Sequence, residues 1–99
     1  MMESKFILKL YITGHTPASE RAVANLHKIC EREFGEVCRV TIIDVLEYPQ
    51  LAEDEKILAT PTLIKKLPPP CKRVIGDLSD EDNFFSRLDL KSFKSKQGE

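Results

Sequence analysis

The sequence has few of the residues that mark a specialised class of protein. It contains no tryptophan, four glycines, and three cysteines that form no Cys-x-x-Cys pair. Seven residues separate the first two cysteines and 32 separate the second from the third, which fits neither a disulfide framework nor a zinc site. We therefore expect Cys30, Cys38 and Cys71 to be reduced, partly buried small hydrophobes.

An excess of charge and long apolar runs are missing as well. The chain has 15 Lys and Arg residues and 16 Asp and Glu residues, a net charge of -1. No net positive field therefore attracts it to nucleic acid or to an anionic membrane. The apolar run at residues 6–8 is broken by Lys9, which makes it too short for a signal peptide or a membrane span. We expect a cytoplasmic protein without nucleic-acid or membrane partners.

The length of 99 residues leaves room for one small domain. We place it at residues 1–90 and expect residues 91–99 to be a disordered basic tail, because they show no periodicity. A domain this short buries a small share of its surface, so oligomerisation would help to stabilise it.

The first half is strongly patterned. Residues 6–12 (FILKLYI) alternate as in a strand, and Thr16 and Pro17 are typical of a helix start. Apolar side chains at three- and four-residue steps predict a helix that ends at Gly35. Residues 37–46 (VCRVTIIDVL) predict a second strand, mostly buried because it is apolar on both faces. Together they predict a βαβ unit with parallel strands.

The second half has shorter elements. A short helix is predicted from Pro49, and strands at residues 62–67 and 71–75 form a hairpin around three prolines. A last helix is predicted after a cap at Ser79. The resulting order, βαβαββα, is that of a thioredoxin-like α/β domain.

Thioredoxin-like enzymes keep their reactive thiol at the start of the first long helix. When residues 15–18 (HTPA) are aligned with the Cys-x-Pro-Cys motif at the proline, His15 and Ala18 occupy the positions of the two cysteines. The thiols that dithiol exchange requires are therefore missing there. Lys72 and Arg73 would favour a thiolate at Cys71, but no base or partner cysteine is identifiable beside it. His15 likewise has no acid or nucleophile placed to form a relay.

A glutathione-binding enzyme is the other catalytic alternative. The hydroxyl of Thr16 or Ser19 would then act beside a cis bond at Thr60-Pro61, although only about 5% of such bonds are cis in folded proteins. Glutathione transferases carry a second helical domain, for which this chain has no room. No metal-ligand cluster or phosphate-binding loop stands out, so we expect no metal and no cofactor.

Three segments carry a family resemblance. They are LKLYITGHTPASERAVANL (8–26), IIDVLEYPQLAEDEKILATPTLIKKLPPP (42–70) and RVIGDLSDEDNF (73–84). They resemble the KaiB family of bacterial circadian-clock proteins. The resemblance implies a thioredoxin-like, non-enzymatic regulator that binds a KaiC-type hexameric ATPase and modulates its phosphorylation and ATPase cycle, in circadian timing or stress-response signalling.

The resemblance also implies KaiA or a histidine kinase as partners where they are present, and a free dimer or tetramer. It further implies fold switching, with an alternative ground-state arrangement of the C-terminal half. Short elements and a proline-rich joint in that half would permit two packings within a few kcal/mol.

The resemblance suggests which residues act. The expected exposed contacts to an acidic partner surface are Lys56, Ala59, Lys65, Lys66 and Arg73, with Arg21 a weaker candidate. Pro61 and Asp89 are expected to set the conformation. Arg87 stands where the family commonly has glycine and is about 0.5–1 kcal/mol better in a helix interior, which favours the thioredoxin-like arrangement. Three lysines in residues 91–99 replace the acidic extension of cyanobacterial members.

Overall fold

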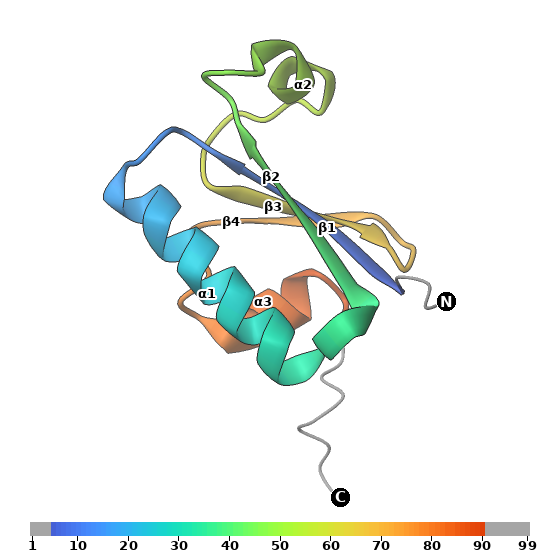
Figure 1. Cartoon of the computed structure of the whole chain (residues 1–99). Helices are drawn as coiled ribbons and strands as arrows, with labels where there is room; N and C mark the ends of the chain where they lie inside the picture. Colours follow the sequence, from blue (N-terminus) through green and yellow to red (C-terminus); the bar gives the residue numbers. More distant parts are fainter. Residues whose placement is uncertain (1–4, 91–99) are drawn as a thin grey trace, which may run out of the picture.

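The fold is a four-stranded sheet with two helices on one face and a short helix at one end (Figure 1). It comes from a computed structural model, which describes residues 5–90. The predicted tail at 91–99 lies outside the described residues. The elements in chain order are β1 (Phe6–Ile12), α1 (Pro17–Glu33), the 3-10 turn η1 (Gly35–Val37), β2 (Cys38–Asp44), α2 (Pro49–Asp54), β3 (Thr62–Leu67), β4 (Lys72–Ile75) and α3 (Glu81–Arg87).

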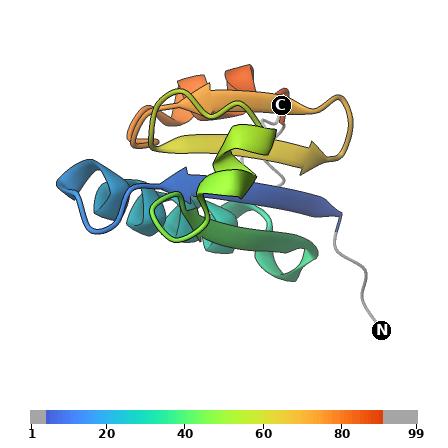
Figure 2. The ribbon, with the colours of Figure 1, turned by 90° about the horizontal axis from the view of Figure 1, so that it is seen from above.

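The strand order across the sheet is β2-β1-β3-β4 (Figure 2). Strand β1 is parallel to β2 and antiparallel to β3, and β3 is antiparallel to β4. The parallel βαβ unit, the hairpin and the thioredoxin-like α/β class are therefore confirmed. The carboxyl ends of β1 and β2 and the amino end of β3 meet at one end of the sheet, where α2 also lies.

Local sequence explains the start and end of α1. The Thr16 hydroxyl accepts a hydrogen bond from the Ser19 N–H at 3.1 Å, and Pro17 occupies the first helical position. The helix ends before Gly35, which adopts a left-handed φ of 60°. The bounds predicted for this helix are confirmed.

The core has a part on each face of the sheet. On the face covered by α1 and α3, the buried side chains of β1 and β3 include Leu8, Leu10 and Leu63. A smaller cluster of Tyr11, Ile43 and Ile64 lies on the other face, with Val45 and Ile57 packed against it. Strands β1, β2 and β3 supply alternate residues to the two parts.

Strand β2 is not mostly buried, so that prediction is wrong. It is an edge strand with a neighbour on one side only, and Ile43 is its one buried residue. Ile42 is 37% exposed. Apolar residues on both faces usually indicate a central strand, but here they lie at an edge.

Helix α3 differs from its prediction at both ends. Its cap is Asp80, whose carboxylate accepts a hydrogen bond from the Asn83 N–H at 3.1 Å, and not Ser79. Arg87 is the last helical residue and not an interior one, so the interior propensity difference applies weakly to it. Asp89 follows with a φ of 57°. No helix within residues 5–90 is long and apolar enough to cross a membrane.

Candidate protein-binding site

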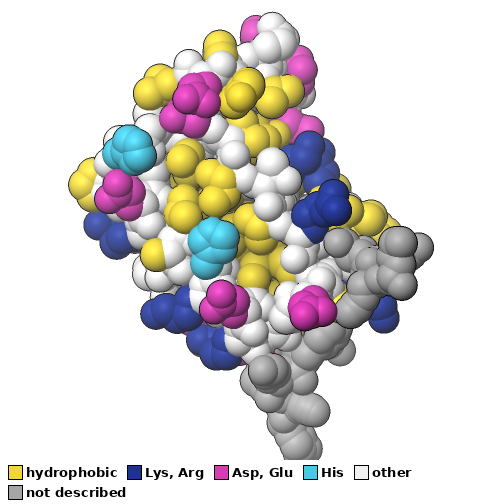
Figure 3. All heavy atoms as spheres, viewed as in Figure 1, with side chains coloured by type: hydrophobic (Ala, Val, Ile, Leu, Met, Phe, Trp, Pro, Cys, Tyr) yellow, Lys and Arg dark blue, Asp and Glu magenta, His cyan; other side chains and the backbone are white. Residues whose placement is uncertain are grey.

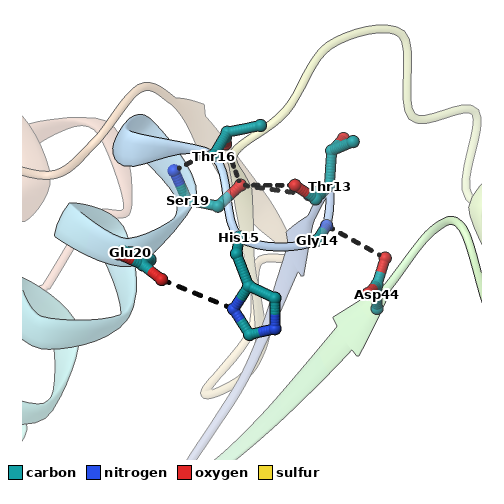
Figure 4. A network of polar contacts seen from close by, with 7 residues as sticks. All are labelled: Thr13, Gly14, His15, Thr16, Ser19, Glu20 and Asp44. Carbon is teal, nitrogen blue, oxygen red and sulfur yellow. Dashed lines mark hydrogen bonds and ion pairs between the residues drawn. The ribbon is translucent and has the colours of Figure 1, made fainter.

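Hydroxyl groups fill the turn between β1 and α1 (Figure 4). The buried Ser19 hydroxyl accepts hydrogen bonds from the Thr13 N–H at 3.1 Å and from the Thr16 hydroxyl at 2.8 Å. The Gly14 N–H donates to the Asp44 carboxylate at 3.1 Å. These bonds satisfy the polar groups of the turn and fix its shape, so the turn is a rigid structural element.

The turn does not assemble a catalytic group. The His15 side chain is 94% exposed, and its Nδ1 lies 3.4 Å from a Glu20 carboxylate oxygen that is itself exposed. The pairing of Tyr11 with Thr62 and of Ile7 with Leu67 places the β3–β4 loop, and with it the exposed Cys71, at the other end of the sheet. Within residues 5–90 no three His, Cys, Asp or Glu side chains are grouped to hold a metal ion.

The turn that follows α2 lies beside the β1–α1 turn. The hydroxyls of Thr13 and Thr60 share a hydrogen bond between the two turns. The Thr60-Pro61 peptide bond is cis, and Pro61 is buried. The Pro61 carbonyl accepts a hydrogen bond from the Gly76 N–H at 2.9 Å, which connects the start of β3 to the end of β4.

Large apolar side chains are exposed around α2. The members of this group, which we call the α2 surface, are Leu46 (68% exposed), Tyr48 (53%), Leu51 (44%) and Leu58 (94%). Figure 3 shows hydrophobic side chains gathered at this end of the molecule, with acidic side chains beside them. A shallow hollow of about 340 Å³ adjoins the α2 surface and is lined in part by Thr13, Pro49, Leu58 and Thr60. Exposed apolar groups of this kind mark binding surfaces in small proteins.

Two of the predicted contact residues lie at the α2 surface. Ala59 is exposed and lines the hollow, and its carbonyl accepts a hydrogen bond from the Thr62 hydroxyl. Lys56 is exposed just after α2, with a left-handed φ of 54°. The Lys56 N–H donates a hydrogen bond to the Glu53 carbonyl at 3.0 Å, and this bond ends the helix. The main chain of Lys56 is therefore fixed at the end of α2, two residues before Leu58.

Lys66 and Arg73 support α2 from beneath. The Lys66 ammonium lies 2.7 Å from a Glu55 carboxylate oxygen, and Arg73 donates to the Glu55 carbonyl at 2.9 Å. The hydrogen bond to Lys66 holds the pKa of Glu55 below its usual range, and the same bond raises the pKa of Lys66. Both cations are already engaged within the chain, so they position the end of α2.

Lys65 and Arg21 lie elsewhere. Lys65 was predicted to be exposed, and that prediction is wrong: its side chain is 0% exposed, and its Nζ has no hydrogen-bond partner among residues 5–90. It shares the helix-covered face with Leu63, two residues earlier in β3. Arg21 lies on α1, where its guanidinium is 2.9 Å from an Asp77 carboxylate oxygen.

The residues expected to control conformation also have local roles. Asp89 occupies the left-handed position after α3, where its N–H bonds the Ser86 carbonyl at 3.2 Å and the Leu90 N–H bonds the Phe85 carbonyl at 2.9 Å. This pair of bonds is the Schellman motif, which ends a helix. The Arg87 guanidinium donates to the Asn83 amide oxygen at 3.2 Å.

The apolar members of the α2 surface were not predicted from the sequence, because the expected contacts to an acidic partner were mainly charged residues. The signal was present in the residues flanking α2, where Leu46, Tyr48 and Leu58 interrupt an acidic segment. The contact between Cys30 and Cys38 was also not predicted, since neither residue belongs to a known cysteine motif.

Comparison with known proteins identifies similar chains over most of the length. The sequence model of the KaiB domain matches residues 9–89. The circadian clock oscillator protein KaiB of Prochlorococcus marinus is 58% identical over 85 residues, 86% of this chain and 75% of that protein. The circadian clock protein KaiB3 of Synechocystis is 51% identical over 87 residues, 88% of this chain and 85% of that one.

Solved structures agree on the fold. The N-terminal domain of SasA from Synechococcus elongatus superposes with a TM-score of 0.71 at 25% identity, covering 90% of this chain and 88% of that one. Mitochondrial thioredoxin 3 from Saccharomyces cerevisiae superposes with a TM-score of 0.70 at 17% identity, covering 88% and 80%. The second likeness extends to the fold alone.

Proposed function

The chain belongs to the KaiB family, and we propose that it is a non-catalytic adaptor that binds a KaiC-type hexameric ATPase through the α2 surface. Binding would modulate the phosphorylation and ATPase cycle of that partner, in circadian timing or in stress-response signalling. Relatives of the chain are named circadian clock proteins, a regulatory class and not an enzyme class.

The exposed α2 surface is the observation that carries this proposal. Leu58 is 94% exposed and Leu46 is 68% exposed, beside a shallow hollow between α2 and the cis-proline turn. Burial of one such leucine by a partner contributes about 1.5–3 kcal/mol to binding. The ion pair between Lys66 and Glu55 keeps this surface in place when the partner is absent.

Charge at the surface would act mainly on the rate of association. Lys56 is exposed and lies two residues before Leu58 in the chain, so its charge is available to an acidic patch on the partner. Charges at the rim of an interface steer encounter and change affinity less. Lys66 and Arg73 would contribute indirectly, because they hold the carboxyl end of α2.

A thiol or glutathione-binding oxidoreductase receives no support from the geometry. His15 and Ala18 occupy the positions of the two reactive cysteines, and Cys71 lies at the other end of the sheet. This alternative is tested by measuring insulin reduction and glutathione binding by the purified chain and, in parallel, by the Cys71→Ser variant. Turnover that the substitution abolishes would contradict the adaptor proposal.

The direct test is the solution mass of the chain with the cognate KaiC-type ATPase and ATP. We expect the chain to move into a large complex, and Leu58→Ser to weaken binding by about tenfold or more. Leu67→Ser is the matched control, because Leu67 is 41% exposed at the opposite end of the sheet. Equal affinities for the two variants would refute the assignment of the α2 surface.

The same mass measurement without the ATPase tests self-association. We propose a free dimer or tetramer, with a second arrangement of the C-terminal half, in which copies of the chain cover part of the exposed apolar surface. KaiA or a histidine kinase, where the organism has one, is a further proposed partner. A free monomer whose mass is independent of concentration would refute the oligomer.

A further inference from the structure

Two thiols meet at the end of the sheet opposite to the α2 surface. The Cys30 sulfur, in the last turn of α1, lies 3.1 Å from the Cys38 sulfur at the first residue of β2. Both cysteines are free thiols. A disulfide bond is about 2.05 Å long, so the sulfurs need to approach by about 1 Å to bond.

Main-chain hydrogen bonds hold the two thiols in place. The Phe34 N–H bonds the Cys30 carbonyl at 2.9 Å and ends α1, and the Lys5 N–H bonds the Val37 carbonyl at 2.8 Å. Cys38 is paired across the parallel ladder from β1. These bonds and the short connection through η1 fix the main-chain positions of the two cysteines.

The two thiols differ in access and in acidity. Cys30 is 7% exposed, whereas Cys38 is half-buried, so a small reagent reaches Cys38 first. A hydrogen bond between the two thiols lowers the pKa of Cys38, and the same bond, together with burial, raises the pKa of Cys30. Its greater access and its lowered pKa both favour Cys38 as the thiol that reacts first.

We propose that Cys30 and Cys38 form a modification site at which a hydroperoxide produces a disulfide between α1 and β2. The Cys38 thiolate attacks the peroxide; an S–O bond forms, the O–O bond breaks, and the leaving oxygen takes a proton to become water or an alcohol. The Cys30 sulfur then attacks the Cys38 sulfenic acid. An S–S bond forms, the S–O bond breaks, and the hydroxide leaves as water with the Cys30 proton. Two electrons pass from the thiols to the peroxide, and an external thiol reverses the reaction by exchange.

The test uses the full chain with Cys71→Ser, which leaves this pair as its only cysteines. Treatment with one equivalent of hydrogen peroxide should remove both thiols together, lower the mass by two hydrogen atoms and give a Cys30–Cys38 cross-linked peptide. Dithiothreitol should restore both thiols. The closed loop should raise the thermal midpoint of the oxidised chain by about 10 °C. Sulfinic acid or cross-linked dimers without the internal disulfide would overturn the proposal.

Single-cysteine variants in the same background test the assignment of roles. With Cys30→Ser, dimedone should trap a stable sulfenic acid at Cys38. With Cys38→Ser, labelling of Cys30 should be at least about tenfold slower, because that thiol is buried. Far-ultraviolet circular dichroism confirms that each variant is folded. Faster labelling of Cys30 would overturn the assignment of Cys38 as the attacking thiol.

Discussion

Replacing Lys65 by methionine should stabilise the protein. The Lys65 ammonium is fully buried without a hydrogen-bond partner among residues 5–90, on the face of the sheet covered by α1 and α3. Its direct neighbour across the hairpin is another lysine, Lys72. Methionine keeps most of the apolar stem and removes the buried charge.

The expected gain follows from the cost of burying an unpaired polar group, about 1–3 kcal/mol in mutational data. A gain of about 2 kcal/mol raises the thermal midpoint of a domain of this size by about 8–16 °C. Lys72→Met is the matched control. Lys72→Met also removes the like-charge pair, but the substituted side chain is exposed. The free energy of unfolding should therefore change by no more than about 0.5 kcal/mol.

Thermal unfolding followed by circular dichroism measures both variants. A Lys65→Met chain that is no more stable than the Lys72→Met chain would contradict this prediction, because the ammonium would then be paired or hydrated in solution. Binding to the ATPase adds a second readout. A buried Lys65 predicts unchanged affinity for the methionine variant, whereas a direct contact to an acidic partner predicts weaker binding.

Three further predictions concern the turn, the loop after β4 and the end of α3. Ser19→Ala should lower the free energy of unfolding by about 1–3 kcal/mol in urea titrations, since it leaves a main-chain N–H unpaired; an effect no larger than that of the exposed Ser86→Ala would contradict this. Arg21→Gln should raise the pKa of Asp77 from about 2 toward 3.8 in an NMR titration. The depressed pKa of Asp77 stabilises the fold at pH values above its pKa in the unfolded chain, and this stabilisation is lost as the pH falls toward 2. The variant lacks this contribution, so its stability should fall less on acidification. An unchanged pKa of Asp77 would contradict the pairing. Asp89→Gly should stabilise by up to about 1 kcal/mol, because glycine accepts the left-handed φ without strain, and Asp89→Val should destabilise; thermal midpoints in the reverse order would exclude this role.

Local patterns predicted the first half of the fold well. A threonine cap, a proline at the first helical position and a glycine stop set the bounds of α1, and each acts within a few residues of its own place in the chain. Alternating apolar residues likewise predicted β1. Such signals depend on short-range backbone chemistry, so the sequence carries them without knowledge of distant contacts.

The candidate site was predicted less completely. Lys56 and Ala59 were correctly placed as exposed residues near α2, because the polar helix around them was recognised. Lys65 was wrongly predicted to be exposed, since a lysine in a short strand usually faces solvent. Its burial depends on contacts between segments that are distant in the chain, such as the packing of α3 against β4.

The order of elements, the βαβ unit, the lack of a thiol in the β1–α1 turn and the family can all be read from the sequence. Only the packed chain shows that β2 lies at an edge, that Lys65 is covered, that Cys71 is remote from the cis-proline turn and that the Cys30 and Cys38 sulfurs touch. The two sets of features differ because the second joins residues that are far apart along the chain. Periodicity and capping are local properties, whereas burial and the meeting of side chains depend on which strands pair and which faces the helices cover.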